Sequence, residues 1–195
     1  MIWGITGYPC AGKGEVSNIL KERGFTTLAL SDLLRERLKI LGVEITRQNL
    51  IDIANFMRER MDNNILMKIA LQKIGANNVI IEGIRHPEEV KELKKYEGKL
   101  IFIQAAQEVR FARMIARNRE KDPSTWNDFL KEEGQQEGTG KGSGLRIKDC
   151  EEMADIVIEN NGTFEELRER VEKILLAEAG KHPEQTKLPE MYNRE

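Results

Sequence analysis

The chain has 195 residues, a length that fits one domain with a substantial core. Its 31 basic and 33 acidic residues leave a net charge of −2, so no overall positive field favours nucleic acid or an acidic membrane. The two cysteines are too few for a disulfide framework or a zinc site, and no apolar run approaches the length of a membrane span. Since no signal peptide precedes the first predicted strand, we expect a soluble protein of the reducing cytoplasm.

A glycine-rich loop separates the first strand, expected at 1–6, from a helix expected at 12–23. The loop sequence fits the phosphate-loop pattern G-x-x-x-x-G-K, and reads Gly7-Tyr8-Pro9-Cys10-Ala11-Gly12-Lys13-Gly14-Glu15. Glycine tolerates backbone angles that let a loop wrap around a phosphate, and amides at a helix start form an anion nest. Lys13 would lie across the terminal phosphates as a point charge. We therefore expect residues 7–15 to bind the phosphates of a nucleotide.

The next segment is predicted to be a short strand at 26–30 followed by three helices. Ser31 can cap the first helix, which carries leucines on one face and stops at a glycine. Thr46 opens the second helix, and Asn63 or Asn64 opens the third, which also ends before a glycine. This stretch therefore forms a helical insertion between two strands.

A continuous apolar run at 79–81 is typical of a strand that is covered on both faces. Pro87 suits the first position of a helix that reaches about residue 96. A fourth strand is expected at 100–105 and a basic helix at 108–119. Asp122-Pro123 is then predicted to cap another helix.

Between 134 and 144 five glycines interrupt any apolar periodicity, which predicts a mobile loop. A fifth strand is expected at 156–158. Thr163 and Glu166 have the spacing of a capping box at the start of the last helix. Residues 180–195 are polar and proline-broken, so we expect a disordered tail.

Strands that alternate with helices predict an α/β fold whose ligand site lies at the carboxyl ends of parallel strands. With the phosphate loop, we expect a P-loop NTPase fold, in which three α/β/α layers surround a five-stranded parallel sheet. The kinase-like domain would span 1–179. Within it, helices at about 31–75 would bind an acceptor, and a region at about 110–148 would form a mobile lid.

Polar groups that could do chemistry follow several of the predicted strands. Asp32 and Arg35 come after the second strand, although on their own they would suggest an ordinary capped helix. Glu82 ends the third strand, where phosphate-loop enzymes place an acid that orients magnesium. Arg85 could bind a phosphate through its guanidinium fork. The alternative for Glu82 is a simple turn.

The predicted helix at 108–119 carries a row of arginines. Arg110, Arg113 and Arg117 share one face through their three- and four-residue spacing, and Arg119 follows. They form either a solvated basic face or a lid that brings positive charge to a transferred phosphoryl group. Further on, the polar turn with Asn160 and Gly162 could face a nucleotide base, but a plain turn is the simpler interpretation.

Taken together, these residues resemble the nucleoside monophosphate kinase branch of the phosphate-loop enzymes over about residues 1–176. The first loop is similar to that of adenylate kinases, where glycine also follows the lysine. More similar still are archaeal kinase-like proteins and the kinase-like domains fused to some deoxycytidylate deaminases. They share Ser-Asp-x-x-Arg-Glu, Gly-Ile-Arg-x-Pro-x-Glu-Val, Asp-Pro-x-Thr-Trp and Ala-Asp-x-x-Ile-x-Asn-x-Gly-Thr. Dephospho-coenzyme A kinase resembles the chain more loosely, in the first loop and around 154–163.

The resemblance implies ATP as phosphoryl donor and Mg²⁺ as cofactor, with Glu82 holding the ion through water. It also implies two further groups of residues. The acceptor would be bound by Asp32, Arg35 and Arg85, with Arg35 and Arg85 on its phosphate. The catalytic groups would be Lys13, Arg113, Arg117 and Arg119.

Gly14 departs from the common phosphate-loop pattern, as adenylate kinases also do, and Glu15 departs from the adenylate kinase pattern. Gly14 lacks the hydroxyl that usually contacts magnesium, so metal binding relies more on Glu82. Glu15 stands where those enzymes have threonine, and its carboxylate repels a phosphate unless it points away or meets a cation.

The leading hypothesis is an enzyme that transfers the γ-phosphoryl group of ATP to a nucleoside or deoxynucleoside monophosphate. An alternative is dephospho-coenzyme A kinase, in which Asp32 would act as general base toward a ribose hydroxyl. A nucleotide-binding regulatory module with little kinase activity is a third possibility, which Glu15 favours. Nucleotides are the expected partners, with neither nucleic acid nor membrane; the sequence carries no code for the acceptor's base or sugar or for the oligomeric state.

Overall fold

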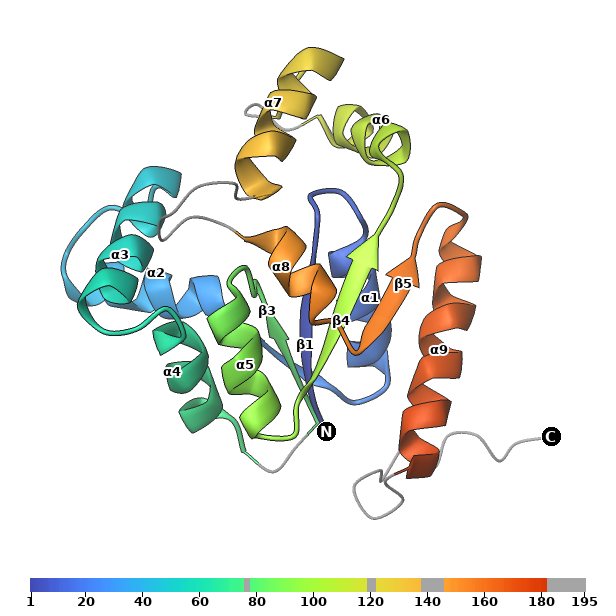
Figure 1. The fold of residues 1–195 in the computed structure, drawn as a ribbon, viewed down its shortest axis with the longest axis horizontal. Helices are drawn as coiled ribbons and strands as arrows, with labels where there is room; N and C mark the ends of the chain where they lie inside the picture. The colour runs from blue at the N-terminus through green and yellow to red at the C-terminus, as the bar shows by residue number, and fades with distance from the viewer. Residues whose placement is uncertain (76–77, 119–121, 138–145, 182–195) are drawn as a thin grey trace.

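The computed structural model describes residues 1–75, 78–118, 122–137 and 146–181. Within these ranges one sheet of five strands runs through the molecule in the order β2-β3-β1-β4-β5, and neighbouring strands are parallel (Figure 1). The strands are β1 (Ile2–Gly7), β2 (Thr26–Ala29), β3 (Val79–Glu82), β4 (Lys99–Gln104) and β5 (Ile156–Glu159). The prediction of a five-stranded parallel sheet is confirmed.

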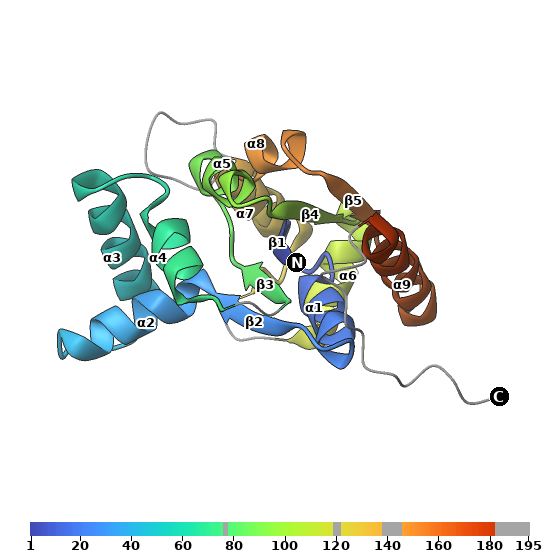
Figure 2. The same ribbon diagram turned by 90° about the horizontal axis from the view of Figure 1, so that it is seen from below.

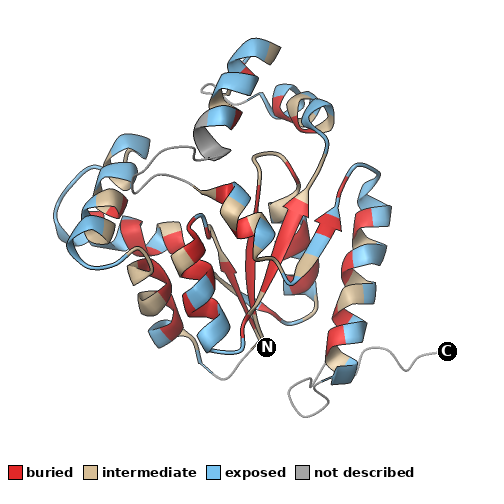
Figure 3. Ribbon diagram, viewed as in Figure 1, coloured by how far each residue is buried: buried red, intermediate tan, exposed pale blue. Residues whose placement is uncertain are grey.

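Helices cover both faces of this sheet. Side chains alternate between the two faces of the sheet along each strand. Trp3 and Ile5 of β1 enter one core, and Val79 and Ile81 of β3 enter the other. The helices α1 (Lys13–Glu22) and α9 (Phe164–Lys181) pack on the first core, and α4 (Ile65–Lys73), α5 (Pro87–Lys95) and α8 (Ile147–Glu152) pack on the second. Figure 3 shows the central strands β1, β3 and β4 and the inner sides of these helices largely buried. The three-layer α/β/α arrangement is confirmed.

The remaining helices flank the carboxyl ends of the strands. Helices α2 (Leu30–Ile40) and α3 (Arg47–Arg60) stand beside α4 at one side of the molecule, as Figure 2 shows from below. Helices α6 (Gln107–Arg117) and α7 (Trp126–Glu137) lie beyond the carboxyl end of β4 (Figure 1). The strand order reverses beside β1, and the crevice at such a point is where open α/β sheets bind ligands.

Three helices begin at capping residues or at a proline that the sequence analysis identified. The hydroxyl of Thr46 accepts a hydrogen bond from the Asn49 amide at 3.1 Å, and α5 begins at Pro87. Thr163 and Glu166 form both bonds of a capping box, at 3.1 and 3.2 Å, at the start of α9. These three predictions are confirmed.

Two predicted helix caps are wrong. Helix α2 begins at Leu30 directly after β2, so Ser31 lies inside the helix, and its hydroxyl accepts a hydrogen bond from Arg35 at 2.8 Å. Helix α7 begins at Trp126, where the Thr125 hydroxyl accepts from the Asp128 amide at 3.2 Å. Asp122 does not cap it because its carboxylate binds Arg117.

The predicted loop at 134–144 is shorter than expected, because α7 continues through Gly134 to Glu137. The rest of that loop, at 138–144, lies outside the described residues. The last helix extends to Lys181, so the expected tail begins later than 180, and 182–195 also lie outside the described residues. Among the described helices, none combines the length and apolar composition that crossing a membrane requires.

Candidate nucleotide-binding site

The loop between β1 and α1 has the backbone that a phosphate nest requires. Gly7 has a φ of 142° and Gly12 a φ of 103°, and both angles disfavour side chains. A Cβ on Gly7 would lie 2.1 Å from the carbonyl oxygen of Ile103, and one on Gly12 would lie 2.2 Å from Nδ2 of Asn160. Only glycine therefore fits at either end of the loop. The fully buried Ala11 anchors it, while the half-buried Pro9 and Cys10 form its outer bend.

The Lys13 ammonium lies inside the loop. Its Nζ donates hydrogen bonds to the carbonyl oxygens of Gly7 and Tyr8, each at 2.7 Å. The pKa of Lys13 is lowered to about 8, first by desolvation and then by the positive charge of Arg85, with Arg110 and Arg117 adding to the effect. Guanidinium groups from two distant segments therefore gather around this ammonium, and an anion at the loop would relieve their repulsion.

Gly14 and Glu15 form the first turn of α1, and both are exposed. A Cβ on Gly14 would meet no atom within 4 Å, so close packing does not demand glycine there. The Glu15 amide donates to the Gly12 carbonyl at 3.1 Å, and the carboxylate is not among the charges that act most strongly on Lys13. The exposed side chain leaves the nest accessible to an anion.

Arg110 has a structural role that the sequence did not indicate. Its side chain is buried, its Nε donates to the Ala105 carbonyl at 2.8 Å, and it forms a buried ion pair with Glu133 of α7. The guanidinium also lies over the rings of Tyr8 and Phe129, at 4.9 and 5.5 Å from their centroids. Arg110 thus joins α6, α7 and the phosphate loop.

The other arginines of α6 face the same loop with different partners. Arg117 makes two hydrogen bonds to Asp122, at 2.5 and 2.8 Å, and its charge lowers the pKa of Lys13.

Arg113 places NH2 3.4 Å from both Oδ1 of Asn160 and the carbonyl oxygen of Gly162. Its NH1 is buried and has no hydrogen-bond partner in the part of the chain that the structure describes. Arg119 lies outside the described residues.

The turn that carries Asn160 and Gly162 has several partners within the protein. Asn160 is buried, and its Nδ2 donates to the Ala11 carbonyl at 2.8 Å while its Oδ1 faces Arg113. A Cβ on Gly162 would lie 1.6 Å from a Glu166 carboxylate oxygen, so this glycine makes room for the capping box. The polar atoms of Asn160 are therefore engaged within the protein, and the contact of Asn160 and Gly162 with a base stays a prediction.

Asp32 and Arg35 lie close together at the start of α2. The Asp32 carboxylate accepts a hydrogen bond from Arg35 at 2.6 Å, and both side chains are exposed. The structure therefore pairs two residues that were both predicted to bind an acceptor.

Arg85 follows β3 through Gly83, whose φ of 84° turns the chain. Its backbone amide donates to Glu89 at 2.9 Å, and its carbonyl accepts from the Arg146 amide at 2.9 Å. The pKa of Arg85 is lowered, first by desolvation and further by the charges of Arg58 and Arg47, while Glu89 acts in the opposite direction. Additional arginines therefore surround the predicted acceptor residue.

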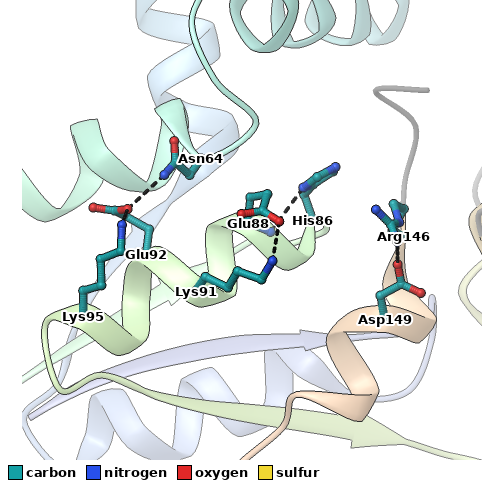
Figure 4. Close-up of polar contacts among 8 residues, drawn as sticks. All are labelled: Asn64, His86, Glu88, Lys91, Glu92, Lys95, Arg146 and Asp149. Carbon is teal, nitrogen blue, oxygen red and sulfur yellow. Dashed lines mark hydrogen bonds and ion pairs between the residues drawn. The ribbon is translucent and has the colours of Figure 1, made fainter. Parts of the chain in front are cut away.

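The sequence analysis did not identify Glu89, a buried carboxylate that holds together α3, the start of α5 and the turn with Arg85. Glu89 is fully buried, pairs with Arg58 of α3 at 3.1 Å and accepts from the amides of Arg85 and His86. Burial raises its pKa, while Arg58 and the amides act against that shift. His86 takes the place of serine or threonine in this capping box, so the usual signature was absent. Figure 4 shows His86 at the start of α5, with Arg146 across from it.

Glu82 ends β3, and its register places it opposite Ile5 of β1 and Ala29 of β2. It is half-buried, and none of the described hydrogen bonds or ion pairs engages its carboxylate. No group of three or more metal-binding side chains occurs within the described ranges. One free carboxylate fits a hydrated Mg²⁺ that takes its remaining ligands from water and phosphate oxygens.

Comparison with known sequences agrees with this fold. Residues 4–139 match the family model described as an AAA domain. A UPF0200 protein of Pyrococcus horikoshii is 32% identical over 184 residues, which cover 90% of this chain and 96% of that protein. A UPF0200 protein of Sulfurisphaera tokodaii is 30% identical over 173 residues, covering 88% and 93% of the two chains.

Solved structures with a similar fold include two shikimate kinases. The enzyme from Bacteroides thetaiotaomicron has a TM-score of 0.60 at 15% identity, covering 90% of this chain and 98% of that one. The enzyme from Acinetobacter baumannii, in complex with shikimate, has a TM-score of 0.58 at 18% identity and covers 93% of each chain. At these identities the likeness shows a kinase-like phosphate-loop fold.

Proposed function

Since the chain belongs to the UPF0200 family and to the family of the AAA domain, we propose that it is a phosphotransferase that takes ATP as donor and a nucleoside or deoxynucleoside monophosphate as acceptor. The observation that carries this proposal is the crowding of positive charge at Lys13. The ammonium lies within a glycine-rich nest, and its pKa is lowered to about 8, first by desolvation and then by the charges of Arg85, Arg110 and Arg117. A polyphosphate supplies the charge that this arrangement lacks.

The chain's own residues divide the work as follows. The amides of 12–15 and the Lys13 ammonium hold and orient the donor phosphates at the start of α1. Arg117 and Arg113 approach from α6 and stabilise negative charge that develops on the transferred group. When the acceptor is a phosphate monoester, positioning and charge neutralisation suffice without a strong base.

The acceptor is assigned to the corner formed by α2, α3 and the turn after β3. Arg85 lies there with the charges of Arg47 and Arg58 close enough to lower its pKa. A group of guanidinium ions favours a dianionic phosphate over a neutral hydroxyl.

Magnesium, when bound, would neutralise charge on the donor phosphates. Glu82 would hold it through water, because its carboxylate ends the strand next to β1 and is not engaged by another described group. Gly14 offers no hydroxyl for this purpose.

A hydroxyl acceptor, such as that of dephospho-coenzyme A, is favoured by one specific observation. Arg35 already binds Asp32 at 2.6 Å, so the pair resembles a carboxylate held in place by a cation rather than a free phosphate ligand. In that case Asp32 would accept the hydroxyl proton as general base.

The test is a phosphate-transfer screen with ATP and Mg²⁺ against the common ribo- and deoxyribonucleoside monophosphates, with dephospho-coenzyme A included. We expect turnover with at least one monophosphate, and Asp32→Asn should lower that turnover less than tenfold. Consumption of dephospho-coenzyme A alone, abolished by Asp32→Asn with binding intact, would favour the hydroxyl acceptor. ATP binding without any product would favour a regulatory module.

A further inference from the structure

Asn160 links three segments that are far apart in the sequence. Its backbone amide donates to the Gln104 carbonyl at 2.8 Å, which fixes the residue to the end of β4. Its Nδ2 donates to the Ala11 carbonyl at 2.8 Å, and this bond is buried. Its Oδ1 lies 3.4 Å from NH2 of Arg113 on α6. The phosphate loop, the central sheet and the arginine helix therefore meet at one residue, whose side chain contacts the first and the last.

These contacts require a side chain that carries both a donor and an acceptor. The Ala11 carbonyl can only accept a hydrogen bond, and the Arg113 guanidinium can only donate one. A side chain between them must donate on one side and accept on the other. Among side chains of this size, a carboxylate lacks the donor and an aliphatic group lacks both functions. The short amide of Asn160 satisfies both neighbours.

Close packing makes this contact part of the loop's conformation. The position that a Cβ would take on Gly12 lies 2.2 Å from Nδ2 of Asn160, so the amide occupies the space that this glycine leaves open. The hydrogen bond holds the Ala11 carbonyl at Asn160. An anion nest is formed by amides, so a carbonyl that is held by a donor elsewhere does not compete with the anion for the same space.

Arg113 supplies a second, independent indication. While NH2 faces Asn160 and Gly162, NH1 is buried and unpartnered within the described part of the chain. A buried guanidinium donor without a partner is costly, and an anion at the loop is the group that could satisfy it.

We propose that Asn160 is a positioning residue that holds the phosphate loop in its anion-binding conformation and docks Arg113 against that loop. The two then act as one unit, so that a nucleotide that enters the nest finds the arginine already in place. This inference rests on the proposed function only for the identity of the ligand.

Asn160→Asp and Asn161→Asp form a matched pair that tests the proposal. Asn160→Asp removes the donor and sets a carboxylate oxygen against the Ala11 carbonyl oxygen. Asn161→Asp adds the same charge one residue away but keeps its acceptor for the Ala106 amide, which the wild-type side chain binds at 2.7 Å. We expect Asn160→Asp to weaken ATP binding at least tenfold by calorimetry, and Asn161→Asp to change it less than threefold.

Hydrogen exchange of the free protein separates this inference from the proposed function. The amides of Ala11, Glu15 and Val16, which are hydrogen-bonded within the loop and the first turn of α1, should exchange at least tenfold faster in Asn160→Asp than in wild type, while amides of β1 should be unchanged. Should the wild-type protein bind no nucleotide, the proposed function fails, but the exchange rates still decide the role of Asn160. Unchanged exchange at these three amides would overturn that role.

A double-variant comparison tests the link to Arg113. Asn160→Ala removes both contacts without adding charge, and it also serves if Asn160→Asp does not fold. We expect Asn160→Ala with Arg113→Met to bind ATP within about twofold of the weaker single variant. Losses that multiply would show that the two residues act separately and would contradict the docking of Arg113.

Discussion

Lys13 concentrates the electrostatics of the site in one ammonium. Its hydrogen bonds to two loop carbonyls keep it within the nest, while desolvation and the neighbouring arginines lower its pKa to about 8. In an unfolded chain a lysine titrates near pH 10.4, roughly two units higher. The folded protein without a bound anion therefore binds this proton more weakly than the unfolded chain does.

ATP affinity should consequently depend on pH. Bound phosphate raises the pKa of Lys13, so above about pH 8 the binding of ATP takes up a proton and its affinity falls, by up to about tenfold per pH unit. Lys13→Arg keeps its charge throughout this range, so its affinity should stay flat. Calorimetry of ATP binding between pH 7 and 10 measures both. A wild-type affinity that is constant across this range would contradict the prediction.

Glu15 is predicted to weaken the nest by a small amount. Its exposed carboxylate lies in the first turn of α1. There it interacts favourably with the helix dipole but repels a bound phosphate. Glu15→Gln should tighten ATP binding about two- to fivefold at low salt, with less gain at high salt. Glu165→Gln, which removes the same charge from the first turn of α9, is the control. Weaker binding in Glu15→Gln would show that the carboxylate takes part in the site.

At the scale of elements, two buried ion pairs fix the helices that approach the nest. The pair of Arg110 and Glu133 joins α6 to α7, and the pair of Arg58 and Glu89 joins α3 to the start of α5. A buried charge that loses its partner is strongly destabilising, although a hydrophobic replacement of both partners often is not.

Arg110→Met should therefore lower the free energy of unfolding by about 3 kcal/mol, because Glu133 is left buried and unpaired. The double variant Arg110→Met with Glu133→Met should recover most of that loss. Urea unfolding of the two variants measures the difference. If the double variant is as unstable as the single one, the loss of stability does not come from the unpaired charge of Glu133.

Arg58→Met should loosen the turn that carries Arg85, since Glu89 loses its cation while keeping the amides of Arg85 and His86. Under the proposed function we expect the KM of the acceptor to rise at least tenfold and the KM of ATP to change less than threefold. Lys91→Met, which breaks an exposed pair with Glu88 on α5, is the control. Equal effects on both substrates would argue against an acceptor role for this corner.

At the scale of the whole molecule, patterns of period and spacing predicted the sheet, its two covered faces and the phosphate loop. The run Val79-Ile80-Ile81 and the glycines at 7 and 12 have few structural alternatives, because burial on both faces and positive φ restrict the residue types. Contacts between distant segments were not predictable in this way. Asn160 bonds to Ala11 across 149 positions, and no local signal announces such a pairing.

The helical corner beside Arg85 shows the same limit. Its buried carboxylate is part of a capping box that begins with histidine, and its cation comes from a helix that starts at Arg47. Helix periodicity places such residues on a face but does not reveal which distant group they meet. The cap assigned to Ser31 failed for a related reason, because β2 leads directly into α2.

The central claim is that residues 7–15 with Lys13 bind a nucleoside polyphosphate. Calorimetry with a non-hydrolysable ATP analogue, AMP and adenosine, on wild type and Lys13→Met, tests it most directly. We predict that the analogue binds at least a hundredfold more tightly than AMP or adenosine, and that Lys13→Met removes this preference. Equal affinity for the three ligands, or a preference that persists in Lys13→Met, would contradict the account.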